Sequence, residues 1–283
     1  MNNGEKNVTP VNVENVIKAA CKLPYCKINR TEFLISQLTG KISEEQLLDA
    51  IENGTINAKI PIKILNVIAD GSVKLEASKA TLISSAAGLP GGVAIAATIP
   101  ADLAQFYAHI FRVAQKLAYI YGYKEIDFDD STHNVLIIFL GAMFGVSAAV
   151  NALAKLATDN AVKIGARIAA KPLTKYAIYN ISKMVLGWIG VKVTKAGVGK
   201  AVSKAIPFVG AALSGGVTLA IFLPMSNKLK KELRKFASMT PEELDKACLA
   251  ADIELSEFYV DPDHYIVNVD DVEISKEDSI NEE

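Results

Sequence analysis

Residues 134–154 read NVLIIFLGAMFGVSAAVNALA, a run of 21 positions without a charged residue or a proline. A second run at 205–227, AIPFVGAALSGGVTLAIFLPMSN, is uncharged over 23 positions. Both runs are rich in Gly and Ala, and such small residues let neighbouring helices approach closely. We therefore expect an all-α fold, a compact multi-helix bundle with these Gly/Ala-rich helices at its centre.

The same two runs reach the length of about 20 residues that an α-helix needs to cross a bilayer. Small residues spaced for helix packing occur in both, namely Gly141, Gly145, Gly210 and Gly215. Two interpretations stay open. The runs are either helices that are buried in a bundle or insert reversibly, which polar positions such as Asn134 and Asn151 favour, or permanent membrane spans.

The N-terminal quarter of the chain predicts short amphipathic helices. Residues 1–11 are polar and are expected to be disordered, and residues 12–70 should form a small N-terminal helical module. Four helices are predicted there, near 12–20, over 29–39, over 44–53 and over 61–69. The third is the clearest, because Ser43 and Gln46 have the spacing of a capping box.

Residues 71–238 are predicted to form a Gly-rich apolar helical core. The uncharged stretch 80–101 should contain two short elements around a helix-turn element made by Gly88, Pro90, Gly91 and Gly92. Pro100 should then start a strong helix over 101–121, which Gly122 ends. Further helices are expected over about 160–171, 173–187 and 190–204.

Residues 239–283 should form an acidic C-terminal helix and tail. Thr240 is a good N-cap, Pro241 suits the first helical position, and acids follow in the first turn, where the helix dipole favours them. This helix should end near Ala251. The remainder should either form a short β pair or stay loose.

Charge is sorted along the chain. Residues 160–231 contain twelve Lys or Arg and no acid, whereas 241–283 contain fifteen acids and two lysines, in a chain whose net charge is −1. Basic residues interleaved with apolar runs suit a partner that is both apolar and anionic, such as a phospholipid surface. The candidate lipid- or anion-binding residues are Lys163, Arg167, Lys171, Lys175, Lys192, Lys195, Lys200 and Lys204.

Composition argues against several other classes of protein. The cysteines Cys21, Cys26 and Cys248 fit no zinc spacing, so we expect reduced thiols, a cytoplasmic setting, no metal and no cofactor. The polar start of the chain has no secretory signal pattern. The near-neutral total charge and the few aromatics in the basic block argue against nucleic acid as a partner. Nothing in the pattern indicates an oligomeric state.

One helix carries a stripe of polar residues. At spacings of three and four residues, five positions of 101–121 share one face about 80° wide: Asp102, Gln105, His109, Arg112 and Lys116. An imidazole and a guanidinium could serve as a base and an anion clamp, so Asp102, His109 and Arg112 are the catalytic candidates. The alternative is an ordinary solvated stripe on an amphipathic helix.

Three segments carry a resemblance to a known family. They are SSAAGLPGGVAIAATIPADLAQFYAHIFRVAQKLAYIYGY at 84–123, FLGAMFGV at 139–146 and IPFVGAALSGGVTLAIF at 206–222. Together they resemble the EcsC family of bacterial proteins, over most of residues 12–240. The resemblance implies a mostly helical, membrane-associated protein without an established enzymatic activity, and it carries over no catalytic residue.

These observations lead to one functional hypothesis and two alternatives. The first is a non-enzymatic, membrane-associated binding or regulatory protein whose partner is an anionic membrane surface or a membrane protein, with peripheral attachment favoured over integral. The second is a hydrolase or transferase that acts on a lipid headgroup or phosphoester through the stripe on 101–121. The third is a protein that inserts into membranes to form pores or cause damage. The acidic tail should either cover the basic block, competing with lipid, or stay solvated.

Overall fold

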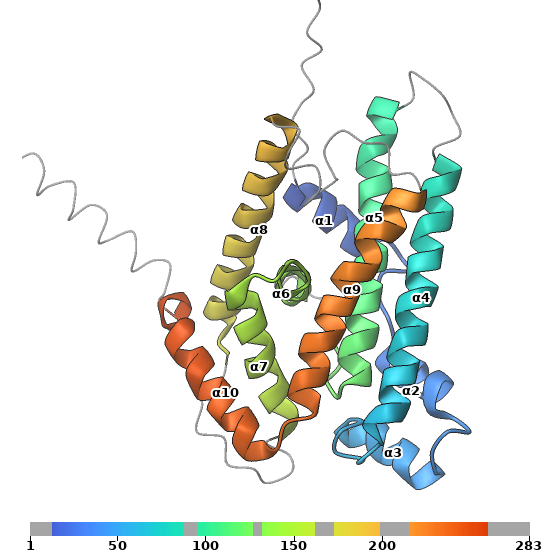
Figure 1. Cartoon of the computed structure of the whole chain (residues 1–283), viewed down its shortest axis with the longest axis vertical. Helices are drawn as coiled ribbons and strands as arrows, with labels where there is room; N and C mark the ends of the chain where they lie inside the picture. The colour runs from blue at the N-terminus through green and yellow to red at the C-terminus, as the bar shows by residue number, and fades with distance from the viewer. Residues whose placement is uncertain (1–12, 88–94, 127–131, 162–172, 199–214, 260–283) are drawn as a thin grey trace, which may run out of the picture.

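The computed structural model describes residues 13–87, 95–126, 132–161, 173–198 and 215–259. These residues form ten α-helices and one short 3₁₀ helix with no strand among them, which confirms the all-α prediction (Figure 1). The helices are α1 (Val13–Lys22), α2 (Arg30–Leu38), α3 (Glu44–Asn53), α4 (Ile62–Ala87), α5 (Ile95–Ile120), α6 (Thr132–Phe144), α7 (Ser147–Ala161), α8 (Lys175–Val198), α9 (Gly215–Ala237), α10 (Pro241–Glu254) and η2 (Ser256–Tyr259). The expected disorder of 1–11 and the expected β pair of the tail lie outside the described residues.

Three of the predicted helix starts are set by capping residues. The Asn29 side chain accepts a hydrogen bond from the backbone N–H of Glu32 at the start of α2. Ser43 and Gln46 form a complete capping box before α3, and Thr240 begins a second one before α10. Each cap satisfies a backbone N–H group that the helix itself leaves unpaired, so the local sequence is sufficient to fix these starts.

Helix α4 is much longer than the sequence predicts, and the expected end at Ala69 is wrong. Gly71 lies inside the helix, where a glycine costs only about 1 kcal/mol relative to alanine. Apolar side chains continue on one buried face from Leu65 through Val73 to Ala80. That face packs against α5 and α9, and its burial outweighs the cost of the glycine. The expected boundary between the N-terminal module and the core therefore falls within one helix.

Helix α5 is enclosed by its neighbours. It begins at Ile95, earlier than the predicted start at Pro100, and ends as predicted before Gly122, whose φ is 91°. Nearly every side chain from Leu103 to Tyr121 is buried, because α1, α2, α4, α6 and α9 all pack around this helix. A polar side chain on α5 is consequently held inside the protein instead of facing solvent.

The apolar run 134–154 is divided between two helices. Helix α6 ends at Phe144 and α7 begins at Ser147, with Gly145 between them at a φ of 81°. The backbone N–H of Val146 donates to the Gly141 carbonyl over 2.9 Å, and that of Gly145 donates to the Ala142 carbonyl. This is the Schellman arrangement that ends a helix at a left-handed glycine. A single helix across the whole run is therefore excluded.

Helices α8 and α9 also differ from the expected boundaries. The sequence predicts helices over 173–187 and 190–204, but α8 is continuous from Lys175 to Val198. Helix α9 passes through Pro224 and continues to Ala237, well beyond the second apolar run. The expected helix over 160–171 and the beginning of that run, 205–214, lie largely outside the described residues. None of the helices within the described ranges combines the length and the hydropathy that crossing a bilayer requires.

Helix α6 occupies the middle of the bundle. Figure 1 shows it nearly end-on, with α7, α8 and α9 around it. Its Leu136, Ile138 and Leu140 side chains are completely buried, so the predicted central position of this segment is confirmed. Helix α10 packs on α7 and buries Leu244 and Cys248. The C-terminal ends of α4 and α8 and the N-terminal ends of α5 and α9 lie together at the upper end of the bundle in Figure 1.

Candidate functional site

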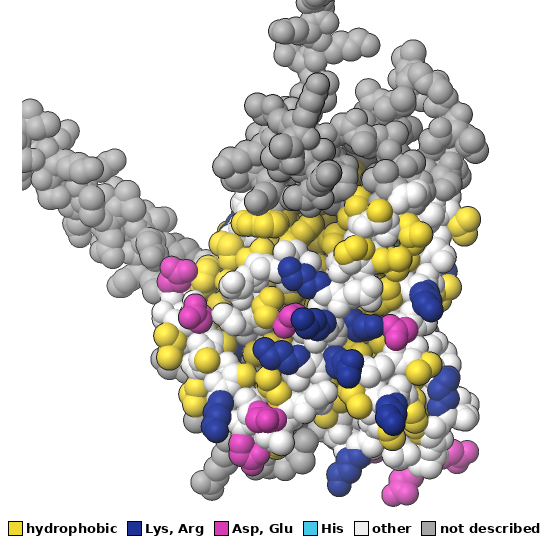
Figure 2. Space-filling model, in the orientation of Figure 1, with side chains coloured by type: hydrophobic (Ala, Val, Ile, Leu, Met, Phe, Trp, Pro, Cys, Tyr) yellow, Lys and Arg dark blue, Asp and Glu magenta, His cyan; other side chains and the backbone are white. Residues whose placement is uncertain are grey.

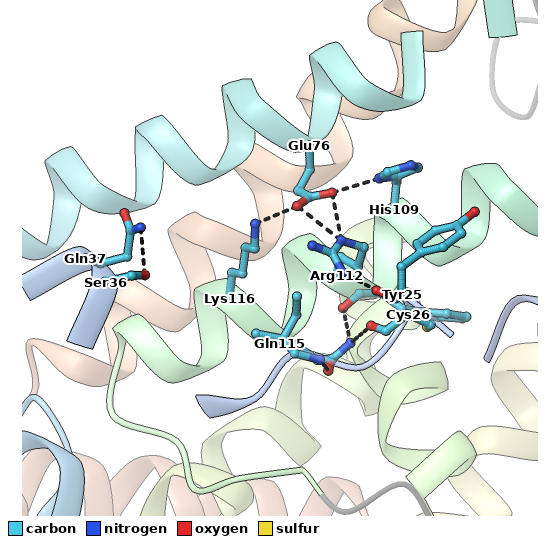
Figure 3. A network of polar contacts seen from close by, with 11 residues as sticks. Tyr25, Cys26, Ser36, Gln37, Glu76, His109, Arg112, Gln115 and Lys116 are labelled. Atoms are coloured by element: carbon cyan, nitrogen blue, oxygen red, sulfur yellow. Dashed lines mark hydrogen bonds and ion pairs between the residues drawn. The ribbon is translucent and has the colours of Figure 1, made fainter. Parts of the chain in front are cut away.

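A buried carboxylate lies where α4 packs against α5. The Glu76 side chain on α4 has no exposed surface and contacts three basic side chains of α5 (Figure 3). His109 Nδ1 lies 2.7 Å from Glu76 Oε2, Arg112 Nε lies 3.2 Å from the same oxygen, and Lys116 Nζ lies 2.5 Å from Oε1. We refer to these four residues as the Glu76 cluster.

The positions of the cluster follow from helical periodicity. His109, Arg112 and Lys116 are three and four residues apart, so they form one line along α5. Glu76 lies on the face of α4 that packs against α5, and it is the one acid in residues 71–101. The sequence shows that Glu76 is isolated from other acids in this stretch, but only the packing of α4 against α5 identifies the partners of its carboxylate.

The cluster lowers the pKa of Glu76. Burial by itself would raise the pKa of this carboxyl, but the hydrogen bond from His109 and the positive charges of Lys116 and Arg112 outweigh burial and lower it to about 2. Burial also lowers the pKa of Lys116, and the attraction to Glu76 only partly opposes this. One carboxylate is shared among three basic groups, so no one of them is fully compensated.

The ionised Glu76 fixes the tautomer of His109. An ionised carboxylate can only accept hydrogen bonds, so His109 Nδ1 must carry the proton in their 2.7 Å contact. In a neutral imidazole, Nε2 then keeps its lone pair, and this atom is buried without a hydrogen-bond partner among the residues that the structure describes. The Tyr25 ring lies over the imidazole, with 5.6 Å between the ring centroids. The arrangement is that of an imidazole oriented by an acid.

The same face of α5 holds the loop that follows α1. The Gln115 amide donates to the Cys26 carbonyl over 2.9 Å and accepts from the Ile28 backbone N–H over 2.9 Å. Arg112 Nη1 donates to the Tyr25 carbonyl. A hydrogen bond between the Cys21 and Cys26 side chains, together with burial, raises the pKa of the Cys21 thiol. The loop is therefore fixed to α5 by groups that also surround the Glu76 cluster.

An open groove of about 630 Å³ runs beside the cluster, between α2, α4 and α5. The residues lining the groove are Lys27, Ile28, Asn29, Glu32, Phe33, Ser36, Gln37, Gly71, Ser72, Leu75, Arg112 and Lys116. Only 7% of the Lys116 side chain and 15% of the Arg112 side chain are exposed. Two cations nearly excluded from water thus form part of its wall, while His109 does not line it.

The structure brings together two of the three predicted catalytic residues. His109 and Lys116 are buried, so a fully solvated stripe is the wrong description of this part of α5. The structure brings His109 and Arg112 together on Glu76, which was not among the predicted residues. Asp102 lies in α5, but its side chain is outside the described part of the chain.

Most of the predicted lipid-binding residues cannot be placed. Lys163, Arg167, Lys171, Lys200 and Lys204 lie outside the described residues, as do Gly88, Pro90, Gly91 and Gly92. Lys192 and Lys195 lie in α8 without a described side chain, and Lys175 is exposed at the start of that helix. Of the helix-packing glycines, Gly141 lies in contact with α7 and α8, since a Cβ there would come within 2.7 Å of a Val185 methyl. Gly145 ends α6, Gly215 is the first residue of α9, and Gly210 is outside the described ranges.

The described structure reveals a different basic surface. Helix α9 carries four exposed cations in its second half, and α4, which packs beside it, carries two more. These six residues, the basic face, are Lys228, Lys231, Arg234 and Lys235 on α9 and Lys63 and Lys74 on α4. An ion pair between Lys230 and Asp70 joins the two helices within this surface. Figure 2 shows Lys and Arg side chains across this side of the molecule, with hydrophobic side chains gathered above them.

Comparisons of the chain with known protein families, with curated proteins and with solved structures found no match.

Proposed function

We propose that this protein is a non-enzymatic binding or regulatory protein that associates peripherally with anionic membrane surfaces. The observation that carries the proposal is the basic face of α9 and α4, which lies next to exposed apolar side chains. Each Lys or Arg close to an anionic bilayer contributes about 1 kcal/mol to binding. Four or five engaged residues would hold the protein at a membrane at physiological salt.

Exposed apolar residues near the upper end of the bundle support the same proposal. Leu82 on α4 is 70% exposed, and Leu219 near the start of α9 is 39% exposed. Large apolar side chains beside a belt of cations suit a surface with charged headgroups over hydrocarbon. The resemblance to the EcsC family, which implies membrane association, points in the same direction and remains a prediction.

Flotation with lipid vesicles tests the proposal. The full chain should float with vesicles that contain phosphatidylglycerol and not with pure phosphatidylcholine vesicles, and salt should weaken the binding. Reversing two charges, Lys231→Glu with Lys235→Glu, should abolish flotation. The matched control, Lys41→Glu with Lys59→Glu, makes the same change in net charge away from the basic face. Equal binding by both double variants would refute the proposed surface.

A second candidate function is a hydrolase or transferase acting on a lipid headgroup or phosphoester. The observation that favours it is the buried Nε2 of His109, which has no hydrogen-bond partner within the described ranges and whose other nitrogen is oriented by Glu76. Such an imidazole could take a proton from an attacking hydroxyl group or water. Turnover of a chromogenic phosphodiester that disappears in His109→Gln would support this function, and equal turnover in that variant would exclude it.

A further inference from the structure

We infer that the groove between α2, α4 and α5 binds a phosphate-type oxyanion through Arg112 and Lys116. The inference does not depend on the basic face, since no residue of that face lines the groove. Three properties of the groove support this assignment: the hydrogen-bonding capacity of the two cations, the charge of the wall and the volume in front of it.

Arg112 and Lys116 each have more N–H donors than they use on the described residues. A guanidinium has five N–H donors and an ammonium has three. Arg112 uses Nε on Glu76 and Nη1 on the Tyr25 carbonyl, and its Nη2 donates to none of the described residues. Among the described residues, Lys116 Nζ has one hydrogen bond, to Glu76 Oε1. Figure 3 shows both side chains projecting from α5 toward Glu76, next to each other.

The charge of the wall is not balanced. Glu76 compensates one of the two permanent cations, and the exposed Glu32 on the rim is opposed by Lys27 on the same rim. One positive charge therefore remains in a wall that is nearly excluded from water. Burying an uncompensated charge is unfavourable, so an anion in the groove would relieve this cost.

The shape and the remaining lining residues define the class of ligand. A volume of about 630 Å³ exceeds what a single phosphate needs and leaves room for an organic group attached to it. Asn29, Ser36 and Gln37 provide neutral donors and acceptors along α2, and Phe33 and Leu75 provide apolar surface. A phosphate monoester or diester with a small polar substituent fits this combination. Soluble phosphoesters and phospholipid headgroups share that chemistry.

Calorimetric titration of the full chain with glycerol 1-phosphate, with glycerol as the uncharged control, tests the inference. Arg112→Lys keeps a positive charge beside Glu76 but removes Nη2, and Lys116→Met removes the ammonium while His109 and Arg112 still hold the carboxylate. Each variant should bind about tenfold more weakly or worse, which is the usual effect of losing one charge-assisted hydrogen bond. Unchanged affinity in both variants would overturn the inference.

A second pair of variants avoids the buried cluster in case the first pair does not fold. Gln37→Glu adds a carboxylate to the groove rim, and Gln46→Glu adds one on α3 outside the groove, at a capping-box position where glutamate is equally suitable. Binding should weaken about tenfold in Gln37→Glu and stay within about twofold in Gln46→Glu. Equal weakening in both would indicate attraction by net charge alone and would overturn the inference.

Vesicles distinguish the two sources of the phosphate. If the ligand is a lipid headgroup, Gln37→Glu should bind phosphatidic acid vesicles more weakly than Gln46→Glu, and glycerol 1-phosphate should compete with them. If the ligand is a soluble phosphoester, the two variants should bind these vesicles equally while differing in affinity for glycerol 1-phosphate. Both results support an oxyanion site. Reversal of Lys231 and Lys235 should leave the affinity for glycerol 1-phosphate unchanged in either case, so failure of the membrane proposal would be seen separately.

Discussion

Replacing Glu76 with glutamine should strongly destabilise the fold. The substitution keeps the size of the side chain and removes its negative charge, while Arg112 and Lys116 remain in place. The buried Lys116 and the largely buried Arg112 would then face each other without a counter-charge. Breaking a buried ion pair by removing one partner costs about 3–5 kcal/mol.

The pKa of Glu76 gives an independent magnitude. It lies at about 2 in the folded protein, against an ordinary value of 4.5. At about 1.4 kcal/mol per pH unit, the ionisation of Glu76 contributes about 3 kcal/mol to the stability of the fold at neutral pH. Because the folded pKa is the lower one, this contribution is complete above about pH 4.5 and is lost as the pH falls toward 2.

Urea unfolding of the full chain, followed by the helical circular dichroism signal, measures the effect. At pH 7, Glu76→Gln should lose about 3 kcal/mol, and the double variant Glu76→Gln with Lys116→Met should recover part of it, because one uncompensated charge is then removed. The difference between Glu76→Gln and the wild-type chain should shrink as the pH is lowered from 4.5 toward 2. A Glu76→Gln variant that unfolds at the wild-type urea concentration at pH 7 would show that the cluster does not stabilise the fold.

Two further predictions concern glycines and the acidic tail. Gly145→Ala should destabilise the fold by about 1–2 kcal/mol, since this residue has a positive φ and its added Cβ would collide with the Lys228 ammonium group. Gly71→Ala, inside α4 with open space around it, should stabilise the fold by about 0.5–1 kcal/mol. Thermal melting compares the two variants, and equal shifts of the melting temperature would contradict these different roles of the two glycines. If the tail competes with lipid for the basic face, a chain truncated after Tyr259, which loses nine acids and one lysine, should bind phosphatidylglycerol vesicles more tightly than the full chain at low salt. The cut is placed after Tyr259 because α10, which lies before it, is part of the packed core. Unchanged flotation would show that the tail does not compete.

Local signals predicted the starts of helices better than their extents. Asn29, Ser43 and Thr240 each accept a hydrogen bond from the residue three positions on, so they act wherever the helix is placed. The lengths of α4 and α8 could not be predicted in this way. Gly71 looks like an interruption in the sequence, but it lies in a helix whose apolar face continues to be buried beyond it. Gly187 lies inside α8, which continues past it with Ile189 buried.

The sequence predicted only part of the candidate site. The line of His109, Arg112 and Lys116 follows from spacing alone, because a helix repeats every 3.6 residues. Whether that line faced solvent depended on which helices cover α5. The covering helices are α1 and α2, which are distant in sequence, and the preceding helix α4, which folds back against α5. The acid that joins the three basic groups, Glu76, is 33 residues before the first of them.

The sequence by itself determined the helical class, the caps and the segregation of charge, because these depend on composition and on contacts within one or two turns. The tertiary structure decided that the basic stripe of α5 is enclosed and that a carboxylate of α4 lies against it. Those outcomes depend on the free energy of burying surfaces that belong to distant segments. That free energy depends on how whole helices pack against one another, so local sequence patterns do not predict it.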